Sequence, residues 1–237
     1  MGEKVKNFED DFARYLDCKY TVMVNSGSSA NLLMIAALFF TKVPYLKPLD
    51  EVIVPAISWS TTYFPLQQYG LRIKFVDINK ETLNFDIPKL KDAISDSTKL
   101  IMAVNLLGNS NEFDQINELI CDKKITLIED NCEALGASYK GIKTGTFGLC
   151  GSFSTFFSHH ISTMEGGIVA TNNQEIYQVL LSLRAHGWTR NLPKNNLITG
   201  QKNDNEFEES FKFILPGYNL RPLEISGAIG IEQIKKL

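Results

Sequence analysis

Cysteine is scarce in this sequence, and none of its cysteines lies in a pattern typical of a disulfide framework or a metal site. The four residues, Cys18, Cys121, Cys132 and Cys150, include no C-x-x-C pair, and no Cys/His cluster has metal-ligand spacing. Isolated thiols in a chain of 237 residues are typical of reduced proteins of the cytoplasm. We therefore expect a cytoplasmic protein with no metal site.

Long apolar runs and an excess of one charge are also absent. The longest apolar runs are too short to span a bilayer, and the charged start, MGEKVKNFEDDF, lacks the apolar core of a signal peptide. The formal net charge is -3, with no long run of Lys or Arg. Since nucleic acids and anionic membrane surfaces are recognised by clustered positive charge, we expect neither as a partner.

What the sequence does contain is an alternation of short apolar runs with segments of helical periodicity. Its composition, 44% hydrophobic and 22% charged, is that of an ordinary globular protein. Expected strands lie at 20–27, 50–56, 72–79, 98–108, 125–132, 151–157 and 166–172, and expected helices at 5–17, 28–40, 60–70, 87–95, 112–124, 174–187 and 226–237. This order predicts an α/β fold with a mostly parallel central sheet and helices on both faces.

Two features concern the extent of the domain. Residues 189–216 are polar and have no sustained period, so we expect a long loop there. The chain opens and stops within amphipathic segments, VKNFEDDFARYLD and SGAIGIEQIKKL, without a cap. We therefore expect residues 1–237 to form one large domain, truncated at both ends.

Parallel α/β sheets bind ligands beyond the carboxyl ends of their strands, and four stretches of this sequence lie there. In the first, NSGSSAN, Gly27 permits a tight turn, and the amides of Gly27, Ser28 and Ser29 point along the axis of the next helix. That arrangement suits a phosphate. By itself, such a stretch is more often an ordinary turn between a strand and a helix.

Two further strands end at Trp59 and Asp130. Trp59, in PAISWSTT, is either a core residue or a platform for an aromatic ring, where stacking contributes about 1 kcal/mol beyond burial. Asp130, in LIEDNCEALG, is either a helix cap or a carboxylate that holds a protonated pyridine nitrogen. Glu133 follows in the same stretch.

The fourth stretch, GSFSTFFSHHISTMEGG, contains two adjacent histidines. Ser154 precedes His159 by five residues, and Gly166 and Gly167 follow it. A histidine in an apolar segment is more often structural. The pair with His160 would be a weak metal site, because no carboxylate or cysteine joins it at ligand spacing.

The order of these four stretches resembles the fold-type I pyridoxal-phosphate enzymes, and among them the DegT/StrS sugar aminotransferases. The resemblance runs through essentially all of the chain to PGYNLRPLEISGAIGIEQIKKL. It implies an aspartate-aminotransferase-like large domain, with the small C-terminal domain missing. It also implies pyridoxal 5'-phosphate or pyridoxamine 5'-phosphate as the cofactor.

The family normally carries a lysine at the position of His159, and that lysine binds the cofactor covalently. Here the nearest lysines, Lys143 and Lys194, are far from the stretch. One branch of the family, the sugar 3-dehydratases, uses a histidine base, so the resemblance implies that His159 is the catalytic base. A second histidine-bearing relative acts on a CDP-linked sugar with an iron–sulfur cluster, but no cysteine follows Cys150 to ligate one.

The resemblance assigns roles to further residues and implies the substrates. Its cofactor-binding residues are Gly27, Ser28 and Ser154 at the phosphate, Trp59 on the ring, Asp130 at the ring nitrogen, Glu133 at the polar edge of the ring, and Asn219 at the phosphate of the neighbouring subunit of a homodimer. L-Glutamate would supply the amino group, and a nucleotide-linked 4-keto-6-deoxyhexose, expected to carry GDP, would lose its 3-hydroxyl. Two other hypotheses stay open: an aminotransferase that uses a different lysine, and a non-catalytic protein of this fold.

Overall fold

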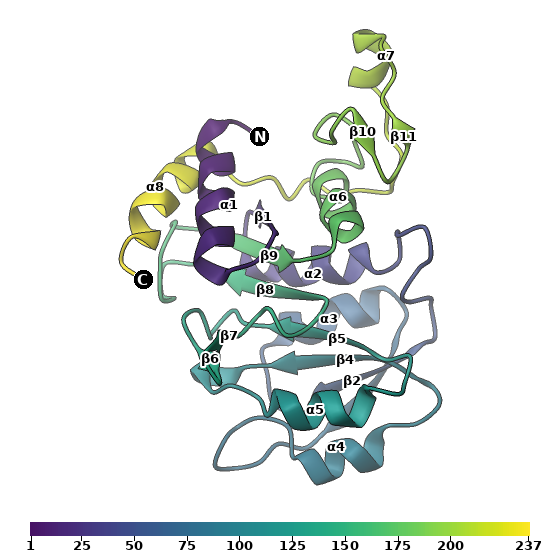
Figure 1. Cartoon of the computed structure of the whole chain (residues 1–237), viewed down its shortest axis with the longest axis vertical. Coiled ribbons are helices and arrows are strands. Elements are labelled where there is room, and N and C mark those ends of the chain that lie inside the picture. Colours follow the sequence, from purple (N-terminus) through teal and green to yellow (C-terminus); the bar gives the residue numbers. More distant parts are fainter.

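A seven-stranded sheet forms the centre of the computed structural model, which describes residues 1–237 (Figure 1). Its strands lie in the order β1-β9-β8-β5-β4-β2-β3. They are β1 (Tyr20–Val24), β2 (Glu51–Pro55), β3 (Arg72–Val76), β4 (Thr98–Val104), β5 (Thr126–Asp130), β8 (Cys150–Ser154) and β9 (Gly167–Thr171). Neighbours pair in parallel from β8 to β3, whereas β9 is antiparallel to both β8 and β1. The predicted mostly parallel sheet is therefore confirmed, with one reversed strand that the sequence did not reveal.

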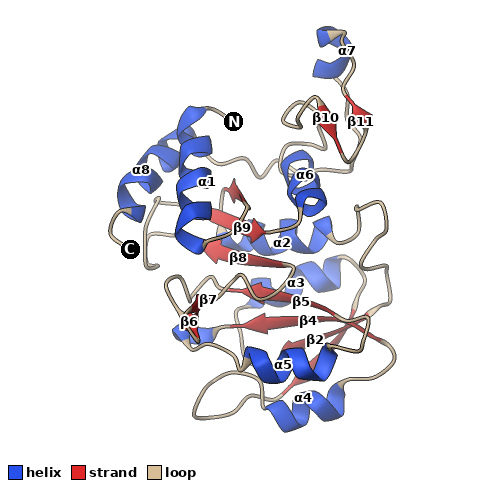
Figure 2. Cartoon of the chain, in the orientation of Figure 1, coloured by secondary structure: helices blue, strands red, loops and turns tan.

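Helices cover both faces of this sheet, as predicted (Figure 2). One face carries α2 (Gly27–Ala37), α3 (Ser60–Gln68) and α6 (Gln174–Leu183); the other carries α1 (Glu3–Leu16), α4 (Ile87–Ala93) and α5 (Phe113–Ile120), and α8 (Glu224–Ile234) packs on α1. None of the helices has the length and apolar character of a membrane-spanning segment. All four cysteines are free thiols.

Strand alternation decides which side chains reach which helices. In β2, Val52 and Val54 pack in the core under α2, while Ile53 packs in the core under α4 and α5. Successive residues of a strand point to opposite faces, so β5 turns Glu129 and Asp130 to different sides. Asp130 thereby shares the α2 side of the sheet, where a helix N-terminus lies.

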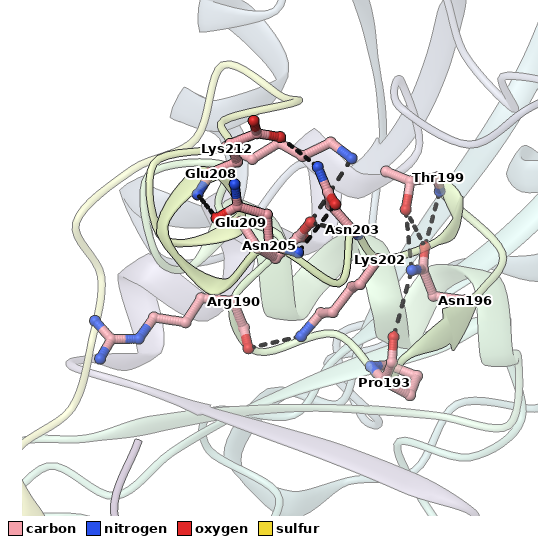
Figure 3. A network of polar contacts seen from close by, with 10 residues as sticks. All are labelled: Arg190, Pro193, Asn196, Thr199, Lys202, Asn203, Asn205, Glu208, Glu209 and Lys212. Atoms are coloured by element: carbon pink, nitrogen blue, oxygen red, sulfur yellow. Dashed lines mark hydrogen bonds and ion pairs between the residues drawn. The ribbon is translucent and has the colours of Figure 1, made fainter.

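The segment 189–216, for which the sequence predicts a long loop, lies mostly outside helices and strands but has short regular elements. It contains a hairpin of β10 (Asn195–Asn196) and β11 (Gly200–Gln201), followed by the short helix α7 (Glu206–Ser210). Asn196 Oδ1 accepts a bond from Thr199 N at 2.8 Å (Figure 3). It also accepts a bond from Ile198 N at 3.0 Å, and the two bonds close the hairpin turn. Polar side chains bonded to nearby backbone build this arm, and such bonds leave no hydrophobic period in the sequence.

Asparagine also begins the helix of this arm. Asn205 is the N-cap of α7 and accepts bonds from the amides of Phe207 and Glu208. Figure 3 shows that Lys202 Nζ reaches back to the carbonyl of Arg190, at 3.0 Å, and so ties the hairpin to the start of the segment. A second hairpin, of β6 (Ser138–Tyr139) and β7 (Ile142–Lys143), lies outside the main sheet.

Candidate active site

The carboxyl ends of five strands surround a cavity of about 430 Å³. Parallel strands end at one edge of a sheet, so segments distant in sequence meet there. The cavity brings together seven of the predicted site residues: Gly27, Ser28, Trp59, Asp130, Glu133, Ser154 and His159. The eighth, Asn219, does not line it.

One end of the cavity is the N-terminus of α2. Ser26 caps this helix, and its Oγ accepts a bond from Ser29 N at 3.1 Å. The expectation that three amides face a phosphate is therefore wrong in one respect, because the amide of Ser29 is already bonded. The amides of Gly27 and Ser28 begin the helix and have no partner within it. Two amides and the helix dipole thus face the cavity.

Gly27 is packed too closely for any side chain. A Cβ atom at this position would lie 2.6 Å from Ser154 Cβ and 3.0 Å from Cys132 Sγ. The missing side chain therefore leaves the Gly27 backbone open at the end of β8, beside the Ser154 hydroxyl. Ser28 Oγ donates to Thr61 Oγ1 at 3.0 Å, which adds the start of α3 to the same polar cluster.

Asp130 is held by a set of donors that the sequence did not indicate. It is only 4% exposed. Asn31 Nδ2 and Thr62 Oγ1 each donate to its Oδ2 at 2.8 Å, and Cys132 N donates to its Oδ1 at 3.1 Å. Ser152 Oγ lies 3.5 Å from the same Oδ1, and Asp130 lines the cavity. No helix begins after Asp130, which rules out the helix-cap interpretation.

Trp59 and Glu133 stand at the sides of the cavity. Trp59 is 68% exposed, so the interpretation as a core residue is wrong. Its ring face is open to a planar ligand. Glu133 Oε2 accepts a bond from Leu107 N at 3.3 Å, which fixes the turn at Leu106–Gly108 and leaves the other carboxylate oxygen unbonded.

The two histidines separate at the cavity wall. His159 lines the cavity, and its Nδ1 is buried without a hydrogen-bond partner. His160 is exposed and lies outside the lining. Neither alternative lysine enters the cavity: Lys143 Nζ lies 3.7 Å from the centre of the Tyr15 ring, and Lys194 pairs with Asp204 at 2.9 Å.

The electrostatics of the lining are acidic. Asp130, Glu133 and Glu165 contribute carboxylates, and none of the 18 lining residues is lysine or arginine. Burial and the neighbouring Asp130 hold the pKa of Cys132 well above its ordinary value, so this thiol is uncharged at neutral pH. No group of three or more His, Cys, Asp or Glu side chains comes together to hold a metal ion.

Sequence comparison assigns the family. The profile of the DegT/DnrJ/EryC1/StrS aminotransferase family matches residues 1–237. The chain belongs to this family. It is 67% identical over 237 residues to the GDP-4-keto-6-deoxy-D-mannose 3-dehydratase of Escherichia coli O55:H7 (strain CB9615 / EPEC), a match that covers 100% of this chain and 61% of the relative. The chain thus spans about three fifths of the length of that relative.

Solved structures confirm the predicted aspartate-aminotransferase-like fold of this DegT-family chain. GDP-4-keto-6-deoxymannose-3-dehydratase with a trapped PLP-glutamate geminal diamine superposes with a TM-score of 0.99 at 66% identity. A histidine-to-asparagine variant of the same enzyme, with bound GDP-perosamine, gives the same TM-score and identity. Each match covers 100% of this chain and 61% of the solved one.

Asn219 does not line the cavity of the DegT-family domain, although the next residue, Leu220, accepts a bond from Asn25 N at 3.0 Å. Asn219 forms an isolated bridge with Ala185, and its Oδ1 accepts a bond from Arg221 Nε at 2.9 Å.

The sequence did not point to Asn31 and Thr62, which orient Asp130. Asn31 lies four residues after Gly27, one helical turn along α2, so its spacing was the available signal.

Proposed function

We propose that this chain is the cofactor-binding part of a PLP/PMP-dependent 3-dehydratase, acting in the cytoplasm on GDP-4-keto-6-deoxy-D-mannose with L-glutamate as the amino donor. One observation carries the proposal: the cavity of this aminotransferase-family domain contains His159 and no lysine. An aminotransferase of the family needs a primary amine in the cavity, and both candidate lysines are engaged elsewhere. The high identity to a 3-dehydratase over the whole chain supports the same reading.

The residues around Gly27 fit the phosphate group of the cofactor. The amides of Gly27 and Ser28 supply two donors at a helix N-terminus, and the Ser154 hydroxyl lies beside them. No lysine or arginine of this chain lines the cavity. This chain would therefore bind the phosphate with these neutral donors and the helix dipole.

Asp130 and Trp59 fit the ring of the cofactor. Asp130 would hold the proton on the ring nitrogen, while Asn31 and Thr62 keep its carboxylate from turning away. Trp59 offers the ring an aromatic face, and Glu133 offers an oxygen to its polar edge. When bound, the cofactor supplies an electron sink conjugated to the reacting carbon.

His159 moves the proton. An imidazole is basic near neutral pH, and the Nδ1 atom of His159 has no partner that would tie up its lone pair or its proton. His159 would take the proton from C4' of the cofactor as the 3-hydroxyl leaves the sugar. Because a histidine does not bind the cofactor aldehyde covalently as a lysine does, the amino form of the cofactor would stay free to react with the sugar.

The net reaction converts L-glutamate and the 4-keto-6-deoxy sugar into 2-oxoglutarate, ammonia and the 3-deoxy-4-keto sugar. Purified protein is therefore expected to release one ammonia for each 2-oxoglutarate, only when cofactor, glutamate and GDP-sugar are all present. Formation of a 4-amino sugar without ammonia would show an aminotransferase instead. Failure to bind either cofactor form would show a non-catalytic protein of the same fold.

We further propose a homodimer with shared active sites. Asn219 lies outside the cavity of its own chain, so a contact between Asn219 and a cofactor phosphate requires a neighbouring subunit. The protein is expected to sediment as a dimer, and Asn219→Ala is expected to weaken cofactor binding by about tenfold, the size of one lost charge-assisted hydrogen bond. A monomer that binds the cofactor with full affinity would contradict shared sites.

A further inference from the structure

His159 lies on a loop whose two ends are joined by buried hydroxyls. Residues 155–166 connect β8 to β9, which pair up to Ser154 and Gly167. At the base of the loop, Thr155 N donates to Gly166 O and Thr163 N donates to Thr155 O, both at 2.9 Å. The 12-residue excursion is thus closed by backbone bonds at its base.

The side chains of Thr155 and Thr163 add a second closure. Both residues are fully buried, and their hydroxyl oxygens lie 2.5 Å apart. Thr163 Oγ1 lies 3.0 Å from Glu165 O and donates to it, so the Thr155 hydroxyl donates to Thr163. A Cβ atom at Gly166 would collide with both hydroxyl oxygens, so glycine leaves the space in which they meet. We refer to Thr155 and Thr163 as the threonine latch.

The His159 ring packs edge-on against Phe156 of the same loop, with ring centroids 6.1 Å apart. A catalytic histidine is commonly held by a partner on its second nitrogen, but His159 Nδ1 has none. Its backbone is fixed on one side by the bond from His159 N to Phe156 O, at 3.0 Å. On the other side, Ile161 is buried in the core with Phe153, and the chain then enters the latch. The ring is therefore placed by the loop backbone and by Phe156, which belongs to the same loop.

We propose that Thr155 and Thr163 are positioning residues for proton transfer by His159. The latch holds the base of the loop rigid, so that His159 faces the cavity while His160 stays in solvent. It also fixes the backbone of Glu165, whose carbonyl it binds and whose side chain lines the cavity. The link to catalysis rests on the proposed function, whereas the placement of the ring does not.

The first test needs no activity. The chain has three histidines, so the imidazole signals of His159 are assignable by NMR from the His159→Asn variant. Thr163→Val removes the hydroxyl and keeps the size of the side chain. We expect it to shift or broaden the His159 signals and to speed hydrogen exchange at the amides of Thr155 and Thr163 at least about tenfold. Thr163→Ser retains the hydroxyl and is expected to behave as wild type.

Thr98→Val is the matched control. Thr98 is a buried threonine at the amino end of β4, away from the cavity, and its hydroxyl donates to Glu51 at 2.7 Å. It is expected to leave the His159 signals unchanged. In turnover assays, Thr163→Val is expected to lower kcat at least about tenfold with KM for the sugar changed less than about threefold, and Thr163→Ser to restore kcat.

Two results would overturn the threonine latch as a positioning device: wild-type His159 signals and exchange rates in Thr163→Val, or equal losses in Thr98→Val and Thr163→Val. A wild-type protein that forms no dehydration product would overturn the proposed function instead. In that case the NMR and exchange measurements alone decide whether the latch positions the ring.

Discussion

Replacement of His159 by asparagine is expected to lower the rate of dehydration by at least about 100-fold, the lower range for a general acid–base group. The asparagine amide keeps a polar side chain at the cavity wall, but it cannot take up a proton near neutral pH. Cofactor binding is expected to stay within about threefold of wild type, because the phosphate and ring contacts lie on other residues. Turnover by ammonia release and cofactor affinity by fluorescence titration separate the two effects.

His160→Asn is the control for this variant. His160 is exposed and outside the cavity, so its loss is expected to change turnover less than about threefold. The neighbouring positions share the same loop, and a general disturbance of that loop would affect both variants alike. A larger loss in His160→Asn than in His159→Asn would show that the wrong histidine has been assigned as the base.

Replacement of Asp130 by alanine is expected to weaken cofactor binding and to reduce turnover still further. Loss of one charge-assisted hydrogen bond costs about 1.5–3 kcal/mol, which is about 10- to 150-fold in affinity. Turnover falls further because the ring nitrogen loses the group that keeps its proton, and the donors Asn31 and Thr62 lose their acceptor. Cofactor titration and ammonia release at saturating cofactor give the two quantities.

Asp86→Ala is the matched control for the loss of a carboxylate. Asp86 caps α4, accepts a bond from Lys89 N at 3.1 Å and does not line the cavity. It is expected to lower stability by about 1 kcal/mol and to leave cofactor affinity unchanged. Wild-type cofactor affinity in Asp130→Ala would show that Asp130 serves only to hold Asn31 and Thr62 in place.

Much of the site follows from the sequence because a parallel sheet gathers its strand ends. Once the apolar runs predict which segments are strands, residues such as Gly27, Asp130 and Ser154 must lie at one edge. The reversed direction of β9 cannot be predicted from the sequence, because a buried strand has the same apolar content in either direction. The position of His159 at the cavity depends on the β8–β9 hairpin that this reversal makes.

Other details depend on contacts that no local pattern encodes. Asn31 and Thr62 meet at Asp130 only after α2 and α3 pack against the sheet. The Ser29 amide is not free to bind a phosphate, because it donates to Ser26, the residue that caps α2. The sequence does not show which serine is the cap, since helix boundaries are uncertain by a residue or two. The sequence therefore predicts the residues that face the cavity better than those that hold them there.

The central claim is that His159 replaces the cofactor-binding lysine of the family and acts as a base beside a cofactor that is not covalently held. The most direct test is borohydride treatment of the pyridoxal-phosphate-loaded protein, followed by peptide mass spectrometry, on wild type and His159→Lys. The account predicts no covalently attached cofactor in wild type, and in His159→Lys an attached cofactor at position 159 together with loss of 3-deoxygenation. A cofactor trapped on any lysine of the wild-type protein, or a His159→Lys variant that dehydrates as well as wild type, would contradict it.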